Sequence, residues 1–87
     1  MNTEFDPAKA VINWRRHRIR LTDAAVALDD PLAIVSEDDR HNEQRFQVIG
    51  ADATGRILTV IFTYRGDSPR IISARKAENW ERKLYED

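Results

Sequence analysis

The chain contains no cysteine, only three glycines and no long apolar segment. Without thiols there is neither a disulfide framework nor a thiolate metal site. Its apolar runs fall far short of the roughly 20 residues that a membrane-spanning helix needs. Polar residues at positions 2, 3, 4 and 6 interrupt any apolar run near the N-terminus, so nothing there resembles a signal peptide. These absences predict a cytoplasmic protein with no membrane association.

Several familiar catalytic and metal-binding motifs are missing as well. There is no Gly-rich phosphate loop, no G-x-S-x-G elbow and no H-x-x-x-H spacing, and His17 and His41 stand alone. The acidic pairs Asp29-Asp30 and Asp38-Asp39 offer carboxylates to a divalent ion, but acidic loop residues are more often simply solvated. We therefore predict neither a metal site nor a cofactor.

The charge of the chain is small overall but unevenly distributed. Its 87 residues, which predict a single domain over residues 1–87, carry a formal net charge of −1. That value argues against a protein that coats nucleic acid through charge alone. The segment Lys9–Arg20 nevertheless contains five basic residues and no acid, whereas Asp29–Glu43 contains six acids and a single arginine. The basic segment either binds phosphate locally or serves only as a solvated surface.

The stretch Gln44–Ala77 has the pattern of a β-meander. Three apolar runs rich in Val, Ile, Phe, Thr and Tyr are separated by polar turns at 52–55 and 66–69. Successive strand residues point to opposite faces. One face of the middle run holds Leu58, Val60, Phe62 and Tyr64, and we expect it to carry helices. The other face offers arginine and hydroxyl groups, which suit phosphate better than a core. In the last run, Ile72 and Ala74 are expected to alternate with Ile71, Ser73 and Arg75.

The segments before the meander predict two helices and a strand. Asp6-Pro7 is a favourable helix start, and the first helix should run over about 7–17. Ala8, Val11, Ile12 and Ile19 give an approximate apolar stripe, although Arg15 breaks it. Thr22 is expected to cap a second, short helix that ends at Asp29-Asp30-Pro31. Residues 32–35 predict a first strand or an extended loop, and 36–43 an exposed acidic segment.

Residues 77–86 predict a closing helix, with Trp80 and Leu84 on one stripe and Glu78 and Arg82 as a pair one turn apart. The predicted order is α-α-β-β-β-β-α. We therefore expect an α+β domain whose helices pack on one face of a small antiparallel sheet. Trp14 and Trp80 are expected to be either core or partner-facing residues.

The side chains that remain suit cleavage of RNA without a metal ion. The 2′-hydroxyl of RNA is already placed to attack the adjacent phosphate, so a protein need only transfer protons and stabilise charge on the phosphate oxygens. Arginine stabilises that charge well because it is always ionised and grips two oxygens. The alternative is that Arg65, Arg70 and Arg75 are ordinary strand-end residues with solvated heads.

Several motifs, taken together, resemble those of one family. They are Asp6-Pro7-Ala8-Lys9-Ala10 with Asn13 and His17, Asp30-Pro31, Glu43-Gln44-Arg45 with Ile49-Gly50, Gly55-Arg56-Ile57-Leu58, Thr63-Tyr64-Arg65, Arg70-Ile71-Ile72-Ser73-Ala74-Arg75, and Glu81-Arg82 with Tyr85. In this order and over nearly the whole chain they resemble the BrnT family of type II toxins. The chain departs from the family's usual pattern where Arg18 replaces a glycine, so the loop after His17 is expected to differ. It also departs in the shortened segment that begins at His41 and in Phe5, which replaces a tryptophan.

The resemblance implies a RelE-like fold and a ribonuclease toxin that arrests bacterial growth. It also implies a ribbon-helix-helix antitoxin, BrnA, in a heterotetramer of two toxins and two antitoxins that binds operator DNA only through the antitoxin. One alternative is a catalytically inactive module of the same fold that acts only in antitoxin docking and co-repression. Another is an RNA-binding domain that does not cleave, although aromatic stacking platforms are missing from the strands.

Site residues follow from the resemblance and from the polar sheet face. Arg65 and Arg75 are expected to bind phosphate and stabilise the transition state, joined by Arg45. His17 is the favoured proton donor or acceptor, because histidine titrates near neutral pH; its alternative is a helix cap or a packing residue. The remaining candidates are Lys9, Glu43 and Tyr85, of which Tyr85 either stacks on a base or packs against the sheet.

Overall fold

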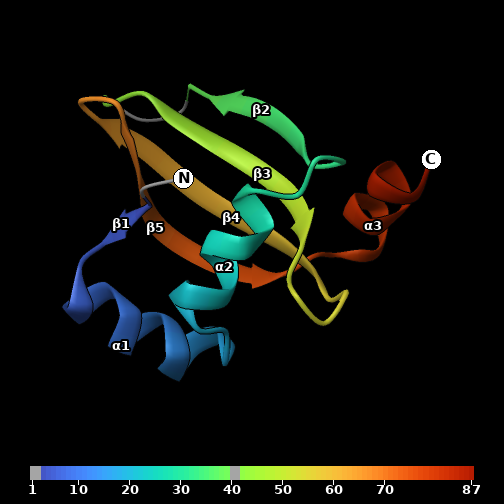
Figure 1. Cartoon of the computed structure of the whole chain (residues 1–87), viewed down its shortest axis with the longest axis horizontal. Coiled ribbons are helices and arrows are strands. Elements are labelled where there is room, and N and C mark those ends of the chain that lie inside the picture. The colour runs from blue at the N-terminus through green and yellow to red at the C-terminus, as the bar shows by residue number, and fades with distance from the viewer. Residues whose placement is uncertain (1–2, 40–41) are drawn as a thin grey trace.

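The computed structural model describes residues 3–39 and 42–87 and shows an α+β domain (Figure 1). None of the helices in these ranges is long and apolar enough to cross a membrane. The elements, in chain order, are β1 (Glu4–Phe5), α1 (Pro7–His17), α2 (Leu21–Leu28), β2 (Ile34–Asp38), β3 (Arg45–Ala51), β4 (Ile57–Arg65), β5 (Ser68–Lys76) and α3 (Asn79–Glu86).

The sheet has five strands in the order β1-β5-β4-β3-β2, and it is mixed. Strands β2 to β5 form the predicted antiparallel meander. The prediction of a wholly antiparallel sheet of four strands was wrong, because β1 pairs in parallel with the start of β5, with Phe5 opposite Ile71. A strand of two residues is too short to leave a period in the sequence.

Strand β2 lies at the free edge of the sheet and starts later than the sequence predicts. It runs through Glu37 and Asp38, in the segment expected to be acidic and exposed, and it pairs with β3 along its whole length. Its residues are nonetheless mostly exposed, so the expected exposure is confirmed although the backbone is extended. Charged side chains on an edge strand discourage pairing with other chains.

Helix α2 covers one face of the sheet, in front of the central strands in Figure 1. Its buried alanines, Ala24 and Ala27, pack with Leu58 and Val60 of β4, as the predicted alternation of β4 requires. Gly50 of β3 lies under this helix, and a Cβ there would come within 2.5 Å of the carbonyl oxygen of Ala27. A glycine is therefore required for α2 to approach the sheet this closely.

Strand β5 contains a bulge. Ser73 pairs with Ile61 but Ile71 pairs with Phe62, so Ile72 is an extra residue on β5. Because of the bulge, Ile71 and Ala74 both enter the core although they are three positions apart. The prediction that Ile72 shares a face with Ala74 was therefore wrong. Ile71 takes the core position under α2, and Ile72 points away from that core.

Helix α1 spans the predicted residues and begins with the predicted cap, since the side chain of Asp6 accepts the N–H of Ala8 at 2.9 Å. Its buried residue, however, is Asn13, whereas the side chains of Val11 and Ile12 from the predicted apolar stripe are each 51% exposed. The helix runs alongside the edge of β5 that β1 leaves unpaired (Figure 1).

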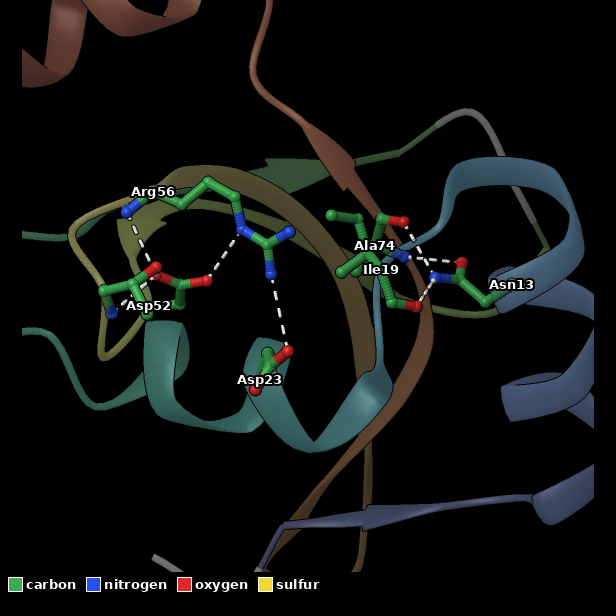
Figure 2. Close-up of polar contacts among 7 residues, drawn as sticks. Asn13, Ile19, Asp23, Asp52, Arg56 and Ala74 are labelled. Atoms are coloured by element: carbon green, nitrogen blue, oxygen red, sulfur yellow. Dashed lines mark hydrogen bonds and ion pairs between the residues drawn. The ribbon is translucent and has the colours of Figure 1, made fainter.

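Asn13 closes that edge of β5 (Figure 2). Its side-chain amide accepts the N–H of Ala74 and donates to the carbonyls of Ala74 and Ile19, all at 2.9 Å. Buried backbone groups need hydrogen-bond partners, and an asparagine can satisfy a donor and an acceptor at once. The polar residue is therefore buried in place of the apolar stripe.

The connection between α1 and α2 is short. Arg18 ends α1 in the left-handed conformation, with φ 56°, and donates its backbone N–H to the carbonyl oxygen of Trp14. Helix α2 then begins at Leu21 with Arg20 as its N-cap, so the predicted cap at Thr22 was wrong. Ile19 and Leu21, each 1% exposed, set this start because both must reach the core.

Helix α3 contacts the face of the sheet opposite α2, contrary to the prediction that all helices share one face. Its buried residue is Glu81, which receives a hydrogen bond from Gln47 of β3 at 3.4 Å. Glu81 also accepts the backbone N–H of Glu78 at 2.8 Å and so closes a capping box at the helix start. The apolar stripe of Trp80 and Leu84 is exposed instead, by 55% and 48%.

Candidate nucleic-acid interface

A groove runs between α1 and β5 on the polar face of the sheet. Two hollows, of about 360 and 340 Å³, share Lys9 and Ile72 in their linings and so adjoin one another. We call them together the α1–β5 groove. Its lining residues are Lys9, Ile12, Asn13, Arg16 and His17 of α1, Glu43, Thr63, Tyr64 and Arg65 from the β3 and β4 side, and Arg70, Ile72 and Ser73 of β5.

Local structure explains why these side chains converge. Lys9 and Arg16 are spaced four and three residues from Asn13, so all three share one side of α1. Since Asn13 is bonded to the edge of β5, this side of the helix must face the strand. On β5 the bulge places Ile72 in the groove floor, between the two hollows.

The groove carries more positive than negative charge. Lys9, Arg16 and Arg65 have no ion-pair partner among residues 3–39 and 42–87, and Arg70 lies 3.7 Å from a carboxylate oxygen of Glu4. Glu43 is already engaged, because Arg45 places two guanidinium nitrogens 3.0 Å from one of its oxygens. Cations without partners beside a hydroxyl-bearing strand suit an anionic ligand such as a phosphodiester.

Arg75 lies elsewhere on the same face. It pairs with Thr59, whereas Arg65 pairs with Ser68 at the far end of β4, six residues or roughly 20 Å away. Its guanidinium binds both oxygens of Glu81, at 2.7 and 3.1 Å. Arg75 and Arg65 therefore share a face, as predicted, but the structure does not bring Arg75 into the groove.

The carboxylate of Glu81 is fully buried, at 0% exposure. Burial alone would raise its pKa, but hydrogen bonds from Arg75 and from the N–H of Glu78 outweigh this and bring the pKa below its usual value. In turn, the hydrogen bond to Glu81 raises the pKa of Arg75. The two side chains form a structural ion pair that attaches α3 to the sheet.

Tyr85 also has a partner outside the groove. Its hydroxyl donates to Asp30 at 2.5 Å, and Asp30 accepts the N–H groups of Ala51 and Leu32 at 2.8 and 2.9 Å. Burial raises the pKa of Asp30, but these hydrogen bonds, led by that from Tyr85, lower it overall. The hydrogen bond to Asp30 raises the pKa of Tyr85. Tyr85 thus attaches α3 to the loop after α2.

A further charged cluster, at the turn between β3 and β4, is structural (Figure 2). Asp52 accepts four hydrogen bonds from Thr54 and Arg56, and Arg56 continues to Asp23 at 3.4 Å. Burial raises the pKa of Asp52, but its hydrogen bonds lower it overall. The carboxylate oxygens of Asp52 and Asp30 thus already accept hydrogen bonds from within the protein. Within the described ranges, no group of three or more potential metal ligands was found.

Of the predicted site residues, the structure gathers Lys9, His17, Glu43 and Arg65 in the groove and connects Arg45 to it through Glu43. Arg75 and Tyr85 anchor α3, and His41 lies outside the described residues. Sequence reasoning did not assign Arg16 and Arg70 to the site, although Arg16 adjoins His17 and Arg70 opens the R-I-I-S-A-R run.

Comparison with known proteins identifies a matching family and a similar fold. A sequence model of the family "Ribonuclease toxin, BrnT, of type II toxin-antitoxin system" matches residues 5–81. The fold is similar to the crystal structure of the Brucella abortus ribonuclease toxin BrnT, with a TM-score of 0.66 and 22% identity over 91% of this chain and 100% of that chain. Comparison with curated protein sequences gave no match.

Proposed function

The chain belongs to the BrnT family of ribonuclease toxins of type II toxin–antitoxin systems, and from that premise we propose that it cleaves RNA in the α1–β5 groove and so arrests growth. The observation that carries the assignment to this groove is its set of converging cations without ionic partners in the described chain, beside His17. The chemistry we propose needs no metal ion. The 2′-hydroxyl attacks the neighbouring phosphorus, and side chains move the protons and stabilise the charge.

Arg65 and Lys9 bind the scissile phosphate in this proposal. Both line the same hollow, and neither has an ion-pair partner within the parts of the chain that the structure describes. A guanidinium grips two phosphate oxygens, and an ammonium adds a compact charge, so the pair stabilises the negative charge that grows in the transition state. Arg70 and Arg16, on either side, hold the adjoining phosphates of the RNA strand.

His17 is the proton-transfer residue in this proposal. It lies at the last position of α1, in the hollow that adjoins the Arg65 hollow through Lys9. An imidazole both accepts and donates a proton near neutral pH, as the attack and the departure of the 5′-oxygen require. Glu43 is the second candidate for proton transfer, and Arg45 holds its carboxylate in place.

We assign Arg75 and Tyr85 positions in the scaffold rather than at the phosphate. Each is hydrogen bonded to a carboxylate of the protein itself, Glu81 and Asp30 respectively. An arginine that already binds a buried carboxylate at two points would have to give up those bonds to grip a phosphate.

The partner in this proposal is a BrnA-like ribbon-helix-helix antitoxin, with two toxins and two antitoxins in the neutralised complex. Operator DNA is then bound through the antitoxin, and the toxin acts in the cytoplasm. The net charge of −1 supports this division of labour, since a chain without an excess of positive charge gains little electrostatic attraction to nucleic acid in general.

The test is cleavage of a long RNA by purified protein in EDTA. Wild type is compared with Arg65→Ala and with Arg82→Ala, which removes an exposed arginine of α3 outside the groove. We expect wild type and Arg82→Ala to cut equally and Arg65→Ala to lose activity while keeping its circular dichroism spectrum.

Each other outcome contradicts a defined part of the proposal. Equal cutting by Arg65→Ala would place the site elsewhere. Cutting that requires added metal would remove the metal-free mechanism. If wild type neither cuts RNA in vitro nor arrests growth when expressed, the protein is the inactive docking module instead.

A further inference from the structure

Helix α1 has a second exposed side, which the groove does not use. Val11 is 51% exposed and Trp14 is 38% exposed, although both are large and apolar. They are exposed because Asn13 takes the buried position against β5. Exposed apolar side chains that gather at one place mark a surface for a partner.

These side chains border a hollow rather than a flat patch. It has a volume of about 370 Å³ and lies where α1 and the start of α2 meet, with Phe5, Ala10, Val11, Trp14 and Leu21 among its lining. We call it the Trp14 hollow. A concave apolar lining of this kind accepts one or two large side chains of another protein.

Trp14 is held in place by two arginines. The guanidinium of Arg20 lies 4.7 Å from the centre of its ring and that of Arg18 lies 5.5 Å from it. Cation–π contacts of this kind orient the indole before a partner arrives, so less side-chain freedom is lost on binding. A partly buried, pre-oriented tryptophan is a common centre of a protein–protein interface.

The surroundings of the hollow are basic. Arg15 and Arg20 belong to its lining, Arg18 flanks it, and the chain from Lys9 to Arg20 contains no acid. A ligand that is apolar alone would leave these charges without partners. The apolar and basic lining therefore suits a protein segment that combines large apolar side chains with carboxylates.

We propose that the Trp14 hollow is the docking site for an acidic, apolar segment of the antitoxin. The identity of the partner rests on the proposed function, whereas the site rests on the residues above. Since the opposite side of α1 carries Lys9, Arg16 and His17 of the groove, a segment seated in the hollow lies one helix width from the RNA site. The same antitoxin molecule can then reach across α1 and block the groove.

The experiment measures affinity for the protein encoded by the adjacent gene of the operon, by isothermal titration with the full-length toxin. Trp14→Ala and Val11→Asp test the hollow, and Arg15→Glu tests its charge. Leu84→Asp is the matched control, because it places the same acid at a similarly exposed apolar site, 48% against 51%, on α3. Circular dichroism and RNA cleavage by each free variant are measured alongside.

We expect Trp14→Ala and Val11→Asp to weaken binding at least about tenfold, and Leu84→Asp to leave it unchanged. Arg15→Glu should slow association and reduce its dependence on salt. The free Trp14→Ala and Val11→Asp variants should cut RNA as wild type does. RNA cleavage by the free variants separates the two proposals. Cleavage is absent if the proposed function is wrong, and it is retained if only the docking site is wrong.

Binding that is unchanged in folded Trp14→Ala and Val11→Asp would overturn the proposal. So would a loss confined to Leu84→Asp, which would place the antitoxin on the exposed stripe of α3. Loss of folding in one hollow variant leaves the other as the test, since Val11 and Trp14 are both partly exposed.

Discussion

Strand β5 presents an arginine near each end, and the two have opposite surroundings. Arg70, beside Arg65 and Lys9, borders an open groove in which cations outnumber carboxylates. Arg75 binds both oxygens of a carboxylate that is 0% exposed. The two ends share a residue type and a sheet face, yet Arg70 makes a single 3.7 Å contact with Glu4, whose side chain is 44% exposed, whereas Arg75 binds a buried carboxylate at two points. The neighbours of an arginine, rather than its position on a sheet face, decide whether it can bind phosphate.

The difference has a physical origin in α3. At the Arg70 end the nearby carboxylates of Glu4 and Glu43 have side chains that are 44% and 55% exposed, so water can solvate both of them. At the Arg75 end α3 brings Glu81 onto the sheet, and a buried carboxylate needs a charged partner with good geometry. The guanidinium of Arg75 is therefore bound to Glu81 rather than available to a phosphate. The predictions below test this contrast, from the largest expected effect to the smallest.

Arg65→Ala should lower the rate of RNA cleavage by about 100-fold or more without changing stability. The reason is that the groove loses a guanidinium that stabilises transition-state charge, while no described residue loses an ion-pair partner. Single-turnover cleavage and urea unfolding give the two numbers. Arg65→Lys should recover part of the rate, because it restores charge without the two-pronged grip.

Arg75→Ala should destabilise the fold by about 2 kcal/mol, because it leaves Glu81 buried without its partner. This value is below that for a fully buried pair, since the Arg75 side chain is 36% exposed and water can enter. Urea unfolding measures it, with Arg82→Ala as the surface control. Cleavage should persist at a temperature where the variant is folded, and a 100-fold loss there would return Arg75 to the active site.

Stability should fall in acid because of Glu81 and Asp52, whose pKa values are lowered in the folded state. The unfolded chain then takes up protons at a higher pH than the folded one, so their contribution is complete above roughly pH 4.5 and is lost as pH falls further. The urea midpoint should therefore drop between pH 5 and pH 3. In Glu81→Gln the drop should be shallower, and an unchanged slope would mean that Glu81 is not ionised in the fold.

Arg18→Gly should give the smallest effect, a gain of about 0.5 kcal/mol. Arg18 has φ 56°, which strains an L-residue by about 1 kcal/mol, and part of the gain is offset by loss of its contact with Trp14. Thermal unfolding measures the gain. Cleavage should change less than twofold, since the end of α1 before it, with His17, keeps its hydrogen bonds.

Much of the framework could be predicted from local pattern. Asp6-Pro7 marked the start of α1, and the turns at 52–55 and 66–69 separated the strands of the meander. The alternation of β4 identified its core residues, including Leu58 and Val60. These features depend on neighbours within a few residues, which is the range over which propensity and period act.

Other features depend on contacts between distant segments and leave no local period. Asn13 is buried because Ala74, 61 residues away, has backbone groups that need partners. Glu81 is buried because Arg75 and Gln47 meet it there. In the sequence both look like exposed residues of amphipathic helices. Their burial turns the apolar sides of α1 and α3 outward, and no hydrophobic period predicts that.

The sequence by itself determined the α+β class, the helix and strand order apart from β1, and the residue types suited to phosphate chemistry. Only the tertiary structure decided which of these residues meet. The fold places Lys9 and His17 of α1 in the same groove as Glu43, Arg65 and Arg70. Arg75 and Tyr85 instead attach α3 to the rest of the domain. The physical reason is that a charged side chain binds whichever partner the fold brings near it, and long-range packing, rather than local sequence, sets that choice.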